Sequence, residues 1–273
     1  MSISRTVRWA ALIAGALFIP TIALATEDMG DDQPSVQSEK APDIKTPDIG
    51  GTGTLDYSYD IDVPSFHGVE PRLSLNYSST RKTKIGGLYQ GWLGYGWGFK
   101  GFDVIERARP SGTVPAFDGT DVFQLNGEEL VTCTSAAASS ASCSAGGNYV
   151  SETENFLEIV RADGNWTITN REGTKMLLKP VSKFGANPDN DQLANGSRWL
   201  VASITDTNGN VVTYDYVCDN QPVCRPKTIS YNATWISFNY EDRPDRIVMA
   251  NGVKLAVTDK RMTSIRIATS GQT

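Results

Sequence analysis

Hydrophobic and polar residues alternate along much of this chain from residue 51 onward. Leu55, Tyr57, Tyr59, Ile61 and Val63 alternate with polar residues, and Leu73, Leu75 and Tyr77 repeat the pattern after a turn that contains Pro and Gly. A period of two is typical of a β-strand with one buried face. The pattern therefore predicts a first hairpin, with strands near residues 55–63 and 73–77.

Asn-Gly and Asp-Gly pairs separate most of the later apolar runs. They stand at residues 126–127, 163–164, 208–209 and 251–252, and Glu172-Gly173 precedes the run at 176–180. These residues tolerate the positive φ angles that tight hairpin turns require. Because no helical period is present outside the N-terminus, we expect an all-β fold. Its antiparallel hairpins would form a sandwich or part of a larger β shell, with one long irregular segment at residues 181–197.

The N-terminus has the pattern of a cleaved signal peptide, residues 1–25. Arg5 and Arg8 precede an apolar run that ends at Leu24, and Ala23-Leu24-Ala25 has the form of a cleavage site. A membrane anchor is the alternative, but the run is shorter than the roughly 20 residues that span a bilayer. We therefore expect export to the periplasm, the cell envelope or the exterior, with no membrane span after cleavage.

Composition changes again after the predicted cleavage site. Residues 26–50 are acidic and poor in large apolar residues, which predicts a flexible leader before a β domain at residues 51–273. The whole chain carries 25 Lys and Arg against 31 Asp and Glu, a formal net charge of −6. Nucleic-acid binding depends on clustered basic residues, which this sequence lacks, so we expect no nucleic-acid partner.

Four cysteines follow in the predicted exported part: Cys133, Cys143, Cys218 and Cys224. Disulfides persist in exported proteins, and of the three possible pairings the spacing favours Cys133–Cys143 and Cys218–Cys224. Each bond would close the neck of a polar stretch between strands and add roughly 2–3 kcal/mol at most. We expect no metal site, because there is no C-x-x-C motif and the single histidine is far away in sequence.

Residues 91–99, GWLGYGWGF, combine glycine with large aromatic side chains. The glycines Gly91, Gly94, Gly96 and Gly98 match neither a P-loop nor a dinucleotide loop, so we expect no cofactor. Glycine lets rings and backbone approach closely, which favours packing of the run against the protein itself. We expect Trp97 to be buried where the first hairpin meets the next strand. Trp166, at a hairpin flank, is expected to matter less for stability.

Three blocks of residues form a recognisable pattern: Ile61, Val63, Pro64, Pro71, Leu73, Leu75, Tyr77, Ser78 and Ser79; then Leu93, Gly94, Gly96 and Trp97; then Gly127, Leu130 and Val131. Together they resemble the N-terminal region of the Salmonella virulence plasmid B protein (SpvB) family and of the B component of insecticidal toxin complexes. WLVASITDTNGNVVTYDY, residues 199–216, is similar to the strand-turn-strand unit of Rhs or YD-repeat proteins. The resemblance covers about residues 51–240.

The resemblance implies a structural, shell-forming role and transfers no catalytic residue. Family members usually continue for many hundreds of residues, sometimes to a C-terminal toxin enzyme, so residues 51–273 are either a whole β domain or one truncated at its C-terminus. Two segments depart from the family pattern: the short turn at residues 67–70 and the insertion KTKIGGLYQ at residues 82–90.

Other residues could carry chemistry, but a plainer explanation fits each of them. His67 would have to serve any Ser-His-Asp triad, yet no G-x-S-x-G elbow exists, and a solvated turn histidine explains it. A charged strand face explains Glu152, Glu154 and Glu158 without a glycosidase pair. Asp189-Asn190-Asp191 lacks the glycine and the terminal glutamate of a calcium loop.

These observations predict a secreted, non-enzymatic β domain. Its expected partners are other toxin-complex or Rhs components, or a downstream toxin segment. The alternative is a module that binds cell-surface glycans or envelope components, which would need exposed aromatic residues lining a groove. Trp92, Tyr95, Trp97 and Phe99 are the candidates for such a platform, and their burial would count against it.

Overall fold

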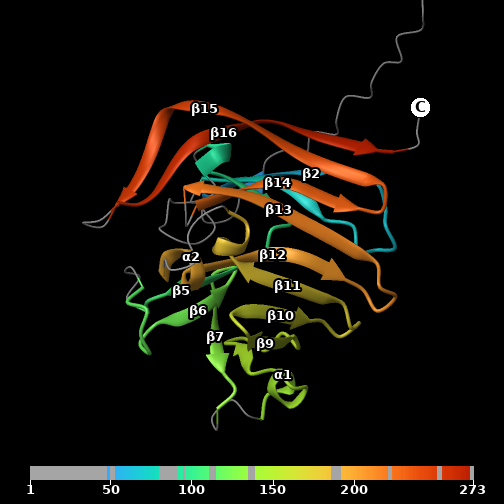
Figure 1. Cartoon of the computed structure of the whole chain (residues 1–273), viewed down its shortest axis with the longest axis vertical. Helices are drawn as coiled ribbons and strands as arrows, with labels where there is room; N and C mark the ends of the chain where they lie inside the picture. The colour runs from blue at the N-terminus through green and yellow to red at the C-terminus, as the bar shows by residue number, and fades with distance from the viewer. Residues whose placement is uncertain are drawn as a thin grey trace, which may run out of the picture. The chain divides into compact units, whose positions relative to one another are not determined.

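Figure 1 shows the computed structural model of the chain. The described residues all belong to the unit Ile44–Thr273: 48–49, 53–79, 91–94, 96–110, 115–134, 139–185, 192–220, 223–250 and 254–270. The predicted signal peptide, most of the predicted leader, the KTKIGGLYQ segment, Tyr95, residues 189–191 and the predicted Asn251-Gly252 turn lie outside them.

The described strands form two sheets. The smaller sheet has the order β1 (Asp48–Ile49), β2 (Leu55–Ile61), β3 (Leu73–Ser78) and β4 (Trp97–Lys100). The larger sheet contains β5 (Val104–Ala108), β6 (Val122–Leu125), β7 (Glu128–Thr132), β8 (Tyr149–Ser151), β9 (Glu158–Ala162), β10 (Asn165–Thr169), β11 (Lys175–Pro180), β12 (Arg198–Thr205), β13 (Val211–Asn220), β14 (Val223–Tyr231), β15 (Thr234–Ala250) and β16 (Lys254–Thr269). The short β1 lies inside the predicted leader and pairs with β2.

Eight strands of the larger sheet, β5 to β12, close into a barrel within the described part of the chain. The ring closes because β12 pairs with both β5 and β11. Arg198–Leu200 of β12 pairs with β5, whereas Ser203–Thr205 pairs with β13. One edge of β12 stays paired with β11 while its other edge changes partner from β5 to β13. The sheet therefore continues through β13, β14, β15 and β16, which Figure 1 shows in orange and red. All pairings are antiparallel, and the all-β prediction is confirmed.

Within the described residues, the hairpin turns stand where the sequence predicts them. Asn126 and Asp163 have φ angles of 53° and 51°, and the glycines that follow them have φ angles of 92° and 75°. Positive φ at both central residues is the requirement of a type I′ turn. The irregular segment is partly helical, with a 3-10 turn η2 (Val181–Lys183) and a short helix α2 (Gln192–Gly196). Another short helix, α1 (Ala141–Ser144), contains Cys143.

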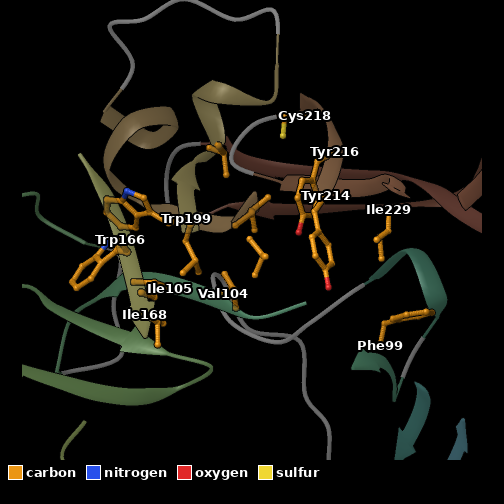
Figure 2. Close-up of a cluster of buried hydrophobic side chains, with 14 of the residues drawn as sticks. Phe99, Val104, Ile105, Trp166, Ile168, Trp199, Tyr214, Tyr216, Cys218 and Ile229 are labelled. Atoms are coloured by element: carbon orange, nitrogen blue, oxygen red, sulfur yellow. The ribbon is translucent and has the colours of Figure 1, made fainter. Parts of the chain in front are cut away.

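Aromatic side chains fill the core in two clusters. Inside the barrel, Trp166 has ring centroids of Phe123, Tyr149 and Trp199 at 5.1, 4.8 and 6.0 Å. The second cluster joins the smaller sheet to the extension of the larger one: Phe99, Phe102, Tyr214, Tyr216 and Phe238. Figure 2 shows the two tryptophans at one side of the buried cluster, with Tyr214, Tyr216 and Phe99 at the other.

Two sequence predictions about tryptophan are wrong. Trp166 is fully buried and not peripheral, because closure of the barrel encloses both flanks of its hairpin. Trp97 is only half-buried. It lies at the first residue of β4 in a cross-strand row with Tyr77 and Tyr57, whose ring centroids are 5.5 and 6.3 Å away. In the Gly-aromatic run, residues 91–99, the side chains buried in the core are instead those of Trp92 and Phe99, both 5% exposed.

Candidate functional site

An open apolar groove of about 360 Å³ lies between the smaller sheet and β16. Its lining comes from β2, β3, the 3-10 turn η1 (Gly91–Leu93) and β16: Tyr59, Ile61, Leu75, Leu93, Met262, Thr263, Ser264, Ile265 and Ile267. The alternating pattern of β2 and β3 directs one apolar row of each strand toward it. No carboxylate, histidine or cysteine lines the groove among the described residues, so its surface suits apolar side chains rather than acid–base chemistry.

The groove follows the outer edge of the larger sheet. Met262 and Ile265 pair with Tyr240 and Phe238, which share one face of β15, because the register shifts between Asn239 and Tyr240. Met262, Ile265 and Ile267 all pack against the core, so the groove runs along the core-facing side of this edge strand. Within the described residues β16 pairs with β15 alone. An edge strand presents unpaired backbone N–H and C=O groups that another strand can pair with. The groove thus combines an apolar surface with a hydrogen-bonding edge.

Cross-strand ion pairs hold the charged part of β16 against β15. Lys260 pairs with Asp242, and Arg261 Nε lies 2.5 Å from Glu241 Oε1. The hydrogen bond and charge of Lys260 lower the pKa of the Asp242 carboxyl, and Asp242 raises the pKa of Lys260 in return. These charges are therefore satisfied within the hairpin, and its apolar end, Met262–Ile267, is the part that remains open to the groove.

The Gly-aromatic run helps to build one wall of the groove. Gly96 has a φ angle of +78°, and a Cβ atom there would lie 2.6 Å from Tyr77 Cε2. Gly94 also has a positive φ angle, of +103°. The rings of Trp92 and Phe99 are buried against Tyr240 and Phe238 of β15. The run therefore packs against the protein, and two of the four candidates for a sugar platform are lost to the core.

The other sequence candidates have structural roles. His67 lies in an exposed turn with a φ angle of 55°, and Glu70 Oε2 accepts hydrogen bonds from the backbone of Phe66 and Gly68. Ser142 Oγ donates to Glu154 Oε1 at 2.6 Å and holds the pKa of that carboxyl below its usual range. A general acid needs the opposite shift. The described residues contain no cluster of metal-ligating side chains, and none of their helices has the length and apolar character of a membrane span.

Both predicted disulfide pairings are present. Cys133 is bonded to Cys143 beside α1, and Cys218 is bonded to Cys224 at the β13–β14 hairpin. Each bond closes the neck of a loop, as the spacing indicated.

Sequence reasoning missed the groove. Its walls come from residues 59–93 and 262–267, which lie far apart in the chain. The available signal was the alternation of Ile265 and Ile267 with polar residues near the C-terminus. Such a pattern indicates a buried strand face but does not identify the strand or sheet that covers it.

Comparison with known proteins agrees with this architecture. Residues 49–251 match the protein family described as Salmonella virulence plasmid 65kDa B protein, SpvB. No curated protein matches the chain. A solved Tc holotoxin pore from Photorhabdus luminescens is similar, with 17% identity and a TM-score of 0.56 over 84% of this chain and 14% of that chain.

Two further solved structures share the fold. One is a TcdB2-TccC3-Cdc42 complex, with 18% identity and a TM-score of 0.56 over 80% of this chain and 13% of that chain. The other is the N-terminal domain of the effector protein SpvB from Salmonella typhimurium strain LT2, with 18% identity and a TM-score of 0.55. That match covers 77% of this chain and 98% of that domain. The chain thus spans a small part of the toxin chains and nearly all of the effector domain.

Proposed function

This chain belongs to the SpvB family, and on that premise we propose that it is an exported, non-enzymatic wall domain of a toxin-associated β shell. The solved Tc toxin structures contain a region of the same fold within much longer chains. In this proposal the domain contributes strands to a container around a toxin segment or a partner. Its partners are toxin-complex or Rhs components.

The free edge of β16 carries the proposal. A shell grows by adding strands at a sheet edge, and the barrel end of this sheet is already closed on itself through β12. Only the β16 end offers an unpaired edge with an apolar groove beside it in the described part of the larger sheet. A β-strand that adds there would pair its backbone with β16 and place alternate apolar side chains in the groove.

Export is part of the same proposal. Residues 1–25 have the pattern of a signal peptide. The two disulfides support it, since such bonds persist in the periplasm and outside the cell and are rare in the cytosol. The direct measurement is a fusion of residues 1–47 to a reporter that is active only after export. A fusion that stays in the cytosol would contradict the proposed export.

Complex formation tests the shell role. The purified chain is mixed with an Rhs-type toxin component from the same organism, and the mass of the product is measured by light scattering. We expect a stable complex for the parent chain and none for Thr263→Arg, which places a charge at an exposed position of the groove. Val211→Arg, on an exposed valine of β13 outside the groove, is the control and should bind normally.

Two results would overturn the proposal. One is a Thr263→Arg variant that melts like the parent chain and still forms the complex. The other is turnover of a glycan or ester by the purified chain, which would make it an enzyme.

A further inference from the structure

Trp235 differs from the other tryptophans among the described residues. Trp92, Trp97, Trp166 and Trp199 each pack against at least one other aromatic ring. Trp235 is 43% exposed and makes no ring–ring or cation–ring contact within the described part of the chain. The isolated indole is therefore not explained by packing.

The strand register leaves this indole uncovered. Trp235 pairs with Ser230 of β14 and with Ala268 of β16. Its neighbours on β15 at the opposite face, Ile236 and Phe238, are buried in the core. Directly opposed residues have Cβ atoms about 4.5–5.5 Å apart, and neither serine nor alanine has a side chain long enough to cover an indole. The ring thus lies on a solvent-facing part of the sheet.

Several hydroxyl side chains lie beside the indole on the same face. The next cross-strand row consists of Thr228, Ser237 and Arg266, and Thr213 of β13 continues the row of Ser230. Side chains in neighbouring rows lie within about 7–8 Å of one another along the diagonal. Short hydroxyl side chains in one plane around an aromatic ring can donate to and accept from the hydroxyls of a sugar ring.

Arg266 adds an uncompensated positive charge. It is exposed and has no carboxylate partner among the described residues. The nearest carboxylate in its row, Asp215, is paired with Lys227, with Nζ and Oδ2 3.0 Å apart. A guanidinium presents a planar fork that matches a carboxylate, so charge complementarity favours an anionic ligand at this point.

We propose that Trp235 and Arg266 form a binding site for an acidic glycan. The indole stacks on the apolar C–H face of a pyranose ring, and the Arg266 guanidinium pairs with the carboxylate of a uronic acid unit. Ser230 and Ser237 exchange hydrogen bonds with the ring hydroxyls. The site lies on the face of β15 opposite to Ile236 and Phe238, so it is separate from the groove and does not depend on the shell role.

Calorimetric titration of the purified chain with tetragalacturonate tests the site, with maltotetraose as the neutral comparison. We expect tetragalacturonate to bind and maltotetraose to bind more weakly. Trp235→Ala should weaken tetragalacturonate binding by about tenfold, the ratio that corresponds to one well-placed stacking contact. Arg266→Gln should abolish the preference for the acidic sugar and leave the weak binding of maltotetraose unchanged.

Controls separate this site from general charge effects and from misfolding. Arg171→Gln, at another exposed arginine, should bind like the parent chain. All three variants should remain folded at the temperature of the titration, and their thermal melts check this. The proposal is overturned if tetragalacturonate does not bind, if Trp235→Ala binds within about twofold of the parent, or if a poly-glutamate peptide binds as tightly as the sugar.

Discussion

At the residue scale, the two tryptophans Trp97 and Trp166 show how strongly closure of the barrel controls burial. Trp166 has no exposed surface and touches three rings inside the barrel. Trp97 is half-buried in a row of aromatic residues on the smaller sheet. The cost of truncating a side chain follows the area and contacts that it buries.

Truncation of Trp166 should therefore destabilise the fold more than truncation of Trp97. We expect Trp166→Ala to lower the free energy of unfolding by about 3–5 kcal/mol, as for other large core residues. Trp97→Ala should lower the free energy of unfolding by about 1–2 kcal/mol. The Trp97 side chain is only half-buried and contacts two aromatic rings. Urea denaturation of both variants measures the difference, and an equal or larger loss for Trp97→Ala would refute this ranking.

The buried hydroxyl of Tyr216 predicts a stabilising substitution. Its oxygen has no hydrogen-bond partner among the described residues, and burial raises the pKa of this phenol well above its usual value. Tyr216→Phe removes an unsatisfied polar group and should stabilise the chain by up to about 1 kcal/mol. Tyr240→Phe is the matched control, since the Tyr240 hydroxyl donates to Pro226 O at 2.8 Å. That variant should lose about 1 kcal/mol in the same denaturation experiment, and a destabilised Tyr216→Phe would contradict the prediction.

At the element scale, two turns that contain glycine distinguish the energetic cost of a strained backbone from the cost of a steric clash. Gly127, in the β6–β7 hairpin, has a φ angle of +92°, and a Cβ atom there would project into open space, with no contact within 4 Å. Gly96, before β4, combines a φ angle of +78° with a contact of 2.6 Å between such a Cβ atom and Tyr77. Both positions require the left-handed region, but only Gly96 also requires the absence of a side chain.

Alanine substitutions at these turns should therefore differ in cost. Gly127→Ala should lower stability by about 1–2 kcal/mol, the cost of the left-handed conformation for an L-residue. Gly96→Ala should cost more, because the Tyr77 ring must also move away from β4. Thermal melts of the two variants give the comparison. Equal melting temperatures would mean that the Tyr77 ring yields freely and that crowding contributes nothing.

At the scale of the whole molecule, buried carboxylates make the fold sensitive to acid. The side chain of Asp121 is buried. Burial by itself raises the pKa of this carboxyl, but hydrogen bonds from the backbone of Ala116 and Phe117 and from Arg107 outweigh that effect and lower it. A carboxyl whose pKa is lower in the folded chain contributes stability above its unfolded pKa and loses it as pH falls.

Stability should therefore decline as the pH falls below about 3.9, the ordinary value for aspartic acid, toward the lower pKa of Asp121 in the folded chain. Asp121→Asn should reduce the stability at neutral pH and flatten this part of the acid decline. Melting temperatures measured across a pH series provide the check, with Asp56→Asn at an exposed position of β2 as the control. A steeper loss of stability at low pH in Asp121→Asn would show that Asp121 is not the source of the acid sensitivity.

The local elements of this protein can be predicted from its amino-acid sequence. Alternating polarity identified the strands, and Asn-Gly and Asp-Gly pairs identified the hairpins at residues 126–127 and 163–164. Cysteine spacing identified both disulfides. These features depend on neighbours within a few residues, because side-chain period and turn geometry are local properties of the backbone.

Which strands meet over long distances depends on the folded arrangement of the whole chain. Closure of the barrel through β12 buried Trp166, and the approach of β16 to β2 and β3 formed the groove. The register of β14, β15 and β16 placed Trp235 beside two small residues and diagonally across from Arg266. Alternation in a single strand shows that it has a buried face, but it does not identify the strand or sheet that covers that face, since many partners can bury the same apolar row.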